Sequence, residues 1–326
     1  VSIFNYDTFT TAIYKAWFGF FSLPTAAQLA SCLVILVFVI VVIEQKMRSR
    51  MRFSENRQSS TPERIQLVGK KKWLVFSYAA LVLSIAFILP TIQLLIWVLE
   101  VFADEFDGRY LTYLWHSLLL GCLAAIVIAV MATILSYAAR RHPDTGTRTL
   151  VRIANLGYAL PGTVLAIGIF IPLAAADNFI IDFCRSAFGI EIGQLLQGTI
   201  IIMLLAYSIR FMAAGFKPID GTMHRITPSI DEAARLLGYR GFAILRRIHV
   251  PILRSGIFTA ATLVFVDVMK EMPITLMTRP FGWDTLSVKI FELTSEGEWE
   301  RAAVPAIFLL ISGLLPIILL MRQTEK

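Results

Sequence analysis

This 326-residue chain has few cysteines and few charged residues, and both shortages exclude common classes of soluble protein. Its three cysteines, Cys32, Cys122 and Cys184, lie far apart without a CxxC spacing, which excludes a disulfide framework and a cysteine-based zinc cluster. Charged residues make up 16% of the chain, whereas soluble domains carry roughly 25%. The sequence also contains neither a GxxxxGK(S/T) phosphate-binding loop nor an HExxH metal-binding pattern. We therefore expect no cofactor and no familiar catalytic constellation in this chain.

Hydrophobic residues, in contrast, make up 57% of the chain and are gathered into long uncharged runs. A helix needs about 20 apolar residues to cross a bilayer core of ~30 Å. The predicted spans are residues 16–43, 73–99, 110–139, 153–176, 192–209, 255–278 and 302–321. The run over 255–278 is the weakest, because three charged residues interrupt it. The sequence thus predicts an all-α integral membrane protein with about seven transmembrane helices.

The net charge of +7 is distributed unevenly among the connections between these spans. Residues 44–72 hold nine lysines and arginines against three glutamates, and residues 217–254 are also strongly basic. Residues 140–152 hold four arginines, Arg140, Arg141, Arg148 and Arg152, whereas the alternate connections carry mostly aspartate and glutamate. Because basic loops stay in the cytoplasm, we expect the N-terminus outside and the C-terminus inside a bacterial inner membrane. The basic surplus then reports topology and a bilayer contact, so we expect no nucleic-acid partner.

The basic stretch over residues 44–72 divides the chain into unequal parts. Its centre, RQSSTPER, is polar and breaks helices, so we interpret the stretch as a flexible connector. One span (1–43) precedes it and a six-span unit (73–326) follows it. Within this unit, the run GYALPG ending at Pro161 and Gly162 predicts a broken helix. Such breaks line substrate cavities in transporters, although a proline-kinked packing helix is an equal alternative.

The connection over residues 217–251 has the pattern of a structured loop. After Pro228, Ser229 and Glu232 have the spacing of a capping box that begins a short helix. Asp231 and Glu232 suit the positive end of its dipole, and Gly238 is a typical helix end. The small side chains of Ala233 and Ala234 leave this helix able to approach a partner closely. A helix repacked on its own protein, without any partner, remains the alternative.

Residues 242–250 follow with apolar positions beside Arg246 and Arg247, which is typical of a helix at the membrane surface. Pro251 is expected to end this second segment before the next span. We expect the nearby histidines, His142, His224 and His249, to be solvated or interfacial.

Three charged residues fall inside the predicted span over 255–278. On a helix, Asp267 reaches Lys270 at i+3 and Glu271 at i+4. Ionisable groups at membrane depth cost ~2.5–3.5 kcal/mol, so all three should face protein or water. They are candidates for a polar translocation path suited to a cationic or metal-chelate substrate. The alternative is an ion-pair lock that holds the helix in the bundle.

The loop pattern resembles a known family. Glu232-Ala233-Ala234, then Gly238, then nine residues to Ile248-x-Val250-Pro251, resembles the EAA loop of ABC-transporter permease subunits. The resemblance implies that the short helix docks on a separate ATP-binding subunit, and that Glu232, Ala233, Ala234 and Gly238 couple ATP use to helix movement. The runs NLGYALPGT (155–163), VDVMKEMP (266–273) and RPF (279–281) resemble the ferric-iron type, in which two permease halves are fused.

This resemblance implies that residues 73–326 are the second half of a fused permease and residues 1–43 the end of the first. The implied function is the permease subunit of an ATP-driven ferric-iron importer, not an enzyme. The implied partners are an ATP-binding subunit in two copies, a periplasmic solute-binding protein, and a first permease half or second permease chain. The alternatives are import of thiamine, polyamine, sulfate or molybdate, a truncated non-transporting remnant, or a membrane enzyme using Asp267 and Glu271.

Overall fold

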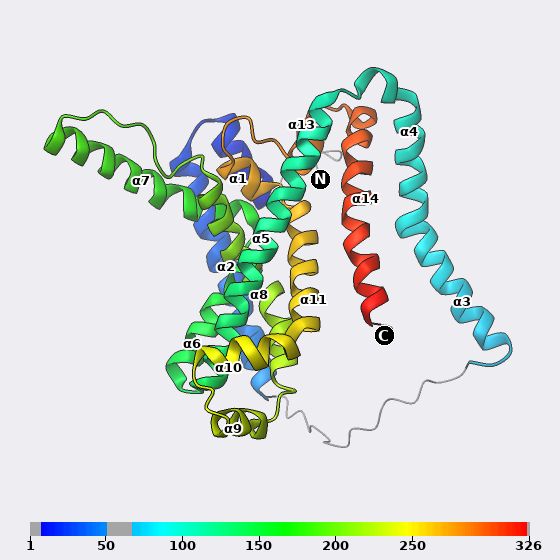
Figure 1. The fold of residues 1–326 in the computed structure, drawn as a ribbon. Coiled ribbons are helices and arrows are strands. Elements are labelled where there is room, and N and C mark those ends of the chain that lie inside the picture. Colours follow the sequence, from blue (N-terminus) through cyan, green and yellow to red (C-terminus); the bar gives the residue numbers. More distant parts are fainter. Residues whose placement is uncertain (1–7, 51–66, 325–326) are drawn as a thin grey trace.

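The computed structural model describes residues 8–50 and 67–324, and helices dominate this part of the chain (Figure 1). Seven of the described helices are long and apolar enough to cross a membrane. No strand occurs in the described ranges. The predicted all-α membrane fold with about seven spans is therefore confirmed.

The helices are α1 (Phe9–Tyr14), α2 (Leu23–Arg50), α3 (Lys70–Leu83), α4 (Leu89–Glu105), α5 (Gly108–Arg141), α6 (Thr145–Ala154), α7 (Gly162–Phe188), α8 (Ile200–Met223), α9 (Pro228–Leu236), α10 (Phe242–Ile244), α11 (Val250–Met269), α12 (Pro273–Thr278), α13 (Leu286–Ser295) and α14 (Trp299–Thr324). A π-helical turn, Ser84–Ile88, joins α3 to α4, and another, Leu245–His249, joins α10 to α11. Each pair is therefore helical throughout.

Helices α5, α8 and α11 pack together as the centre of the bundle. Small residues such as Ala124 and Ala206 are fully buried there, which allows the helix backbones to approach closely. Larger side chains, among them Tyr207, Ile128 and Val264, fill the remaining space. Helix α14 joins this centre to α4. In Figure 1, α6, α9 and α10 lie at one end of the bundle, called here the α9 end, and α13 lies at the opposite end.

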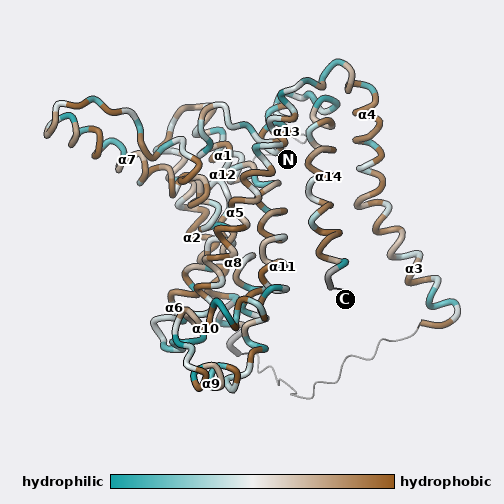
Figure 2. The backbone as a smooth tube through the Cα atoms, viewed as in Figure 1, coloured by the Kyte–Doolittle hydropathy of each residue, from teal (hydrophilic) through white to brown (hydrophobic). Residues whose placement is uncertain are grey.

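Large apolar surfaces remain uncovered along the outer helices. The hydropathy colouring of Figure 2 shows α3 and α4 as mostly hydrophobic, and neither helix has a buried residue. Helix α7 projects sideways from the bundle (Figure 1). In a bilayer such surfaces meet lipid or another helix without the cost of exposing them to water.

Several predicted spans begin or end elsewhere in the structure. The span predicted over 153–176 is α7, which begins at Gly162 and continues to Phe188. Residues 192–199 are mostly irregular, and α8 continues past Ile209 to Met223. The prediction ended this span at Ile209 because the next residue, Arg210, is charged. In the structure Arg210 pairs with Glu271 inside the bundle, so the helix continues. The predicted span over 255–278 is not one continuous helix, since α11 ends at Met269 and α12 is separate.

The front of the chain differs as well. The predicted span over 16–43 is interrupted near Phe21, whose φ of 50° is left-handed, and α2 then begins at Leu23. Helices α2 and α3 extend into both ends of the predicted linker over 44–72. The polar centre of that linker lies outside the described residues.

Candidate functional site

Helix α9 carries the predicted coupling residues, but its first turn differs from the predicted capping box. The helix begins at Pro228 with Thr227 as N-cap, and no side chain caps it. Proline favours the first helical position, because its φ is already helical and it has no N–H to satisfy. Ser229 therefore lies inside the first turn, where its hydroxyl contacts that of Thr227 at 2.9 Å. The capping-box role predicted for Ser229 and Glu232 is wrong.

The predicted end of this helix is confirmed. The amide of Gly238 donates to the carbonyl of Arg235, and that of Tyr239 donates to Ala234. This pair of bonds is a Schellman motif, which satisfies the last carbonyls of the helix. It requires a left-handed residue after the helix, and Gly238 supplies it with a φ of 85°.

A guanidinium from the end of α5 fixes α9 against the bundle. Arg140 contacts the carboxylate of Asp231 through both Nε and Nη2, at 3.0 and 2.9 Å. Its Nη1 donates to the carbonyls of Met223, the last residue of α8, and of Ile226 just beyond it. The side chains of Arg140 and Asp231 are only 18% and 19% exposed. One residue therefore joins α5, α8 and α9.

Asp231 has a second partner in His249, whose Nε2 lies 2.6 Å from Asp231 Oδ1. His249 is fully buried, although it was predicted to be solvated or interfacial, whereas His142 and His224 are exposed. Burial acts to raise the pKa of Asp231, but the hydrogen bonds from His249 and Arg140 outweigh burial and hold it below the ordinary value. Asp231 thus links α9 to the turn that leads into α11.

The two small residues of α9 differ in exposure. Ala234 is buried against the bundle, whereas Glu232 and Ala233 are exposed. Leu236 and Leu237 are 89% and 77% exposed, so apolar side chains extend the outward surface. We call Glu232, Ala233, Leu236 and Leu237 the α9 outer face. An apolar patch of this kind, beside a carboxylate and with nothing described covering it, suits a protein contact.

The segment after α9 does not end at Pro251 as predicted. Pro251 occupies the first turn of α11, where it is tolerated, and the chain is helical from Phe242 to Met269. Ile248 lies in the π-helical turn and is half-buried. The hydroxyl of Tyr137 on α5 donates to the carbonyl of Gly241 at 2.9 Å, which holds the start of this segment.

A second site forms where two helix breaks meet. The predicted break at Pro161 and Gly162 is confirmed, since a 3-10 turn, Leu156–Ala159, separates α6 from α7. The other break separates α11 from α12. Arg210 of α8 lies between them, donating to the carbonyl of Leu160 at 2.8 Å and facing Glu271 with 3.1 Å between Nε and Oε2.

The three charged residues do not lie on one helix as predicted, because Glu271 lies beyond the end of α11, where its carboxylate pairs with Arg210. The Glu271 side chain is 7% exposed. A β-carbon at Gly162 would lie 2.7 Å from Glu271 Oε1, so a larger residue here would require the Glu271 side chain to shift. The predicted pair of Asp267 with Lys270 is present at 2.8 Å, with the Lys270 side chain 65% exposed.

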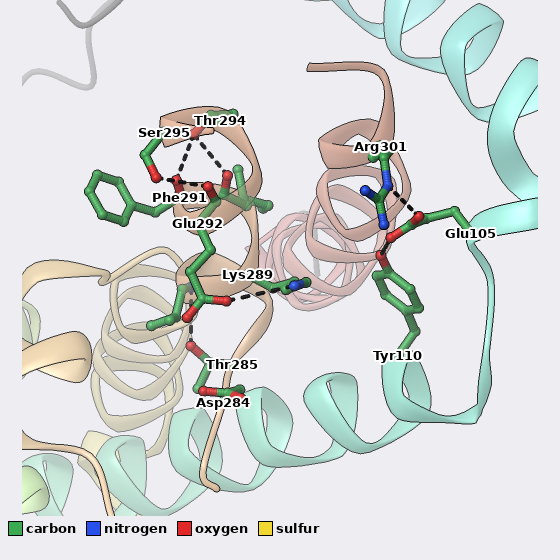
Figure 3. A network of polar contacts seen from close by, with 12 residues as sticks. Glu105, Tyr110, Asp284, Thr285, Lys289, Phe291, Glu292, Thr294, Ser295 and Arg301 are labelled. Carbon is green, nitrogen blue, oxygen red and sulfur yellow. Dashed lines mark hydrogen bonds and ion pairs between the residues drawn. The ribbon is translucent and has the colours of Figure 1, made fainter. Parts of the chain in front are cut away.

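A third polar cluster ties helices together at the opposite end of the bundle. Figure 3 shows Arg301 of α14 directed at Glu105 of α4, with Tyr110 of α5 beside it. The Tyr110 hydroxyl donates to Glu105 at 2.6 Å. Arg279 pairs with Asp284 and with Glu292 of α13. The described residues contain no cluster of three or more histidine, cysteine or acidic side chains that would suit a metal ion.

Sequence reasoning missed the two arginines that organise these sites. Arg140 belongs to a predicted basic loop, which was interpreted from the sequence only as evidence of membrane topology. Arg210 was treated as the end of a span. A single arginine between the uncharged runs 200–209 and 211–216 is the signal that could have found it, because a charge at that depth needs a buried partner.

Comparison with known proteins agrees with this fold. No protein-family model matches the chain. The crystal structure of a bacterial ABC transporter involved in alginate import has a TM-score of 0.58 at 16% identity, covering 78% of this chain and 96% of that one. A putative 2-aminoethylphosphonate transport system permease protein, PhnV of Salmonella typhimurium, is 26% identical over 69% of this chain and 79% of its own length. The chain is thus similar in sequence to ABC-transporter permease proteins and has the fold of one, and seven of its described helices are long and apolar enough to span a membrane.

The similarity extends over the whole chain for one relative. This relative is the Fe(3+)-transport system permease protein FbpB 2 of Haemophilus influenzae, which is 26% identical over 331 aligned positions. The alignment covers 100% of this chain but only 62% of the relative. The chain thus spans about three fifths of that permease.

Proposed function

We propose that this chain forms the second half of a two-half permease, together with the end of the first half, in an ABC importer for ferric iron. The similarity of this chain, over its whole length, to a permease named for Fe(3+) supports this substrate. The relative PhnV is named as a putative permease for a different substrate, 2-aminoethylphosphonate. Thiamine, polyamine, sulfate and molybdate therefore remain the substrates against which iron must be tested.

The observation that carries this proposal is the α9 outer face, held on the bundle by Arg140 and His249. In the proposed function, a separate ATP-binding subunit binds this face, and a second copy binds the first permease half. ATP is hydrolysed on those subunits. Because α9 is joined to α5, α8 and α11 through Asp231, a push on α9 moves the centre of the bundle.

The basic loops give the proposed orientation in a bacterial inner membrane. The α9 end faces the cytoplasm with the C-terminus, and the N-terminus lies outside. A periplasmic solute-binding protein then delivers substrate to the α13 end. The helix breaks around Pro161, Gly162 and Glu271, with the neighbouring pair of Asp267 and Lys270, border the proposed translocation path. Because iron is the proposed cargo, the proposal does not require a permanently bound metal ion in this region.

Co-purification of the ATP-binding subunit tests the coupling role. Glu232→Arg reverses a charge on the α9 outer face, and we expect it to abolish association. Glu300→Arg on α14 is the matched control, because it makes the same charge change at an exposed position at the α13 end. Equal retention of the ATP-binding subunit by wild type and Glu232→Arg would refute docking at α9.

Uptake measurements test the substrate and the need for a first half. Cells that express the chain with a first permease half, the ATP-binding subunit and the binding protein should take up radioactive ferric iron. Unlabelled spermidine, thiamine, sulfate or molybdate should not compete. Competition by one of these would replace iron as the proposed cargo, and uptake that is absent with every substrate would support the inert remnant.

A further inference from the structure

A groove of about 420 Å³ lies on the side of the bundle, between α5 and the helical segment that contains α10 and α11. We call it the α5–α11 groove. Ile126 and Val130 of α5 form one wall, and Phe242, Val250 and Ala261 lie on the other. Arg246 also borders it. The proposed docking at α9 does not use this groove.

The lining of the groove is chemically simple. Its side chains are apolar apart from Thr133 and Arg246, and the Thr133 hydroxyl donates to the carbonyl of Ala129 within α5. Arg246 is exposed, and no described residue makes a hydrogen bond or an ion pair with its guanidinium. The groove therefore offers one cation beside an extended apolar channel. A ligand with an apolar chain and an anionic head matches this arrangement.

The surroundings of the groove point to lipid rather than water. Ile126 and Val130 are 62% and 54% exposed, on the outward side of a membrane-spanning helix. Phe242 is also exposed, and it begins the helical segment that carries Arg246 near the α9 end. An arginine at this boundary can extend its head group to the phosphate layer while apolar neighbours meet acyl chains.

We propose that the α5–α11 groove binds one anionic phospholipid, with an acyl chain along α5 and the head-group phosphate on Arg246. The proposal rests on the proposed function in one respect, the placement of the α9 end at the cytoplasmic leaflet, where anionic lipids gather. A helix of the first permease half is the competing occupant.

The position of the groove gives the bound lipid a route to the coupling loop. Leu245 and Arg246 border the groove and belong to the same π-helical turn as His249. His249 in turn holds Asp231 of α9. A lipid in the groove therefore packs against the turn through which α9 is connected to α11, and it stabilises one arrangement of that turn.

Native mass spectrometry of the purified transporter complex tests this site. The complex is delipidated and then titrated with phosphatidylglycerol or with phosphatidylcholine, and the lipid retained per complex is counted. We expect phosphatidylglycerol to bind more tightly, and Arg246→Gln to weaken it about fivefold, the effect of removing one cation near a membrane surface. Arg247→Gln is the matched control, because that neighbouring guanidinium lies 5.4 Å from the Tyr239 ring and is absent from the groove lining.

A second variant tests the apolar part of the groove. Ala261→Leu places bulk in the channel without changing charge, and it should displace the bound lipid while Arg246 remains. Val250→Phe at the groove wall serves the same purpose if Ala261→Leu does not fold. Equal losses in Arg246→Gln and Arg247→Gln, or full binding in the filled-groove variant, would overturn the proposal.

The competing occupant gives a different result. If a first-half helix fills the groove, Arg246→Gln leaves lipid retention unchanged, and a cysteine at Val130 cross-links to the first half; this overturns the lipid site. These outcomes differ from failure of the proposed function, which is read from co-purification of the ATP-binding subunit.

Discussion

Arg140 Nη2 lies 2.9 Å from Asp231 Oδ2, and the same guanidinium donates to carbonyls at the end of α8 and just beyond it. One side chain therefore closes the end of one membrane helix and fixes the short helix that follows it. Because Arg140 itself belongs to α5, the position of α9 depends on the relative position of two central helices.

Arg140→Met should loosen α9. The substitution leaves a mostly buried Asp231 carboxylate without its arginine, a change that costs about 3–5 kcal/mol when the pair is fully buried and less here, because both side chains are partly exposed. Hydrogen exchange of the α9 amides should rise, and retention of the ATP-binding subunit should fall. Arg141→Gln, at an exposed neighbouring arginine, should change neither. Unchanged exchange in Arg140→Met would show that α9 is fixed by other contacts.

The Asp231 contacts should make α9 sensitive to acid. The pKa of Asp231 is lower in the folded protein than in the unfolded chain, so this carboxylate stabilises the fold above its unfolded value of about 3.9. The stabilisation is lost as the pH falls through the lower folded pKa. Hydrogen exchange of α9 in detergent should therefore rise in that acid range and stay constant near neutrality. Asp231→Asn should be less stable at neutral pH and should lose this dependence; an identical acid profile in both proteins would contradict the assignment.

The different burial of Ala233 and Ala234 should give separable defects. Ala233→Arg adds a long side chain to the α9 outer face, so the permease should assemble normally but lose the ATP-binding subunit. Ala234→Arg forces a charge into a buried position, so α9 should detach from the bundle and its amides should exchange faster. Co-purification and hydrogen exchange on the same samples distinguish the two. Fast exchange in Ala233→Arg would mean that this residue also supports the helix.

The features of this site that depend on neighbouring residues could be predicted from the sequence, whereas contacts between distant residues could not. The end of α9 at Gly238 and the break at Pro161 were predicted correctly, because glycine and proline act through local backbone geometry. The start of α9 was misplaced by two residues, because Pro228 at the first helical position excluded Ser229 as the cap. The seven spans followed from apolar run length, whereas the boundaries of α8 and α11 did not.

The remaining contacts join residues far apart in the chain. Arg140 meets Asp231, 91 residues later, and Arg210 meets Glu271 across two helices. A charge in a predicted span signals that a partner exists, but helix periodicity cannot identify a partner on another helix. The prediction also placed Glu271 on one helix with Asp267, whereas α11 ends at Met269.

Asp267→Asn tests whether the exposed pair at the end of α11 contributes to transport. Lys270 is largely exposed, so the pair adds little stability, about 0–1 kcal/mol. We expect normal assembly and an unchanged melting temperature, with reduced uptake of the substrate because a charge bordering the proposed path is removed. Lys270→Gln should also assemble. Lost assembly in Asp267→Asn would instead identify a structural pair and remove Asp267 from the path.

The buried pair of Arg210 and Glu271 should behave differently, because it connects the two helix breaks. Arg210→Met leaves the Glu271 carboxylate buried without its partner and the Leu160 carbonyl without its donor, so we expect a loss of about 3–5 kcal/mol. The double variant Arg210→Met/Glu271→Leu should recover most of this loss, because apolar residues of similar volume can replace a buried ion pair. Melting temperatures of the purified variants measure the recovery, and a double variant no more stable than Arg210→Met would contradict it. Substrate uptake by the recovered protein then decides the role of the pair: normal uptake identifies a structural lock, whereas lost uptake in a stable protein shows that movement at the breaks needs these charges.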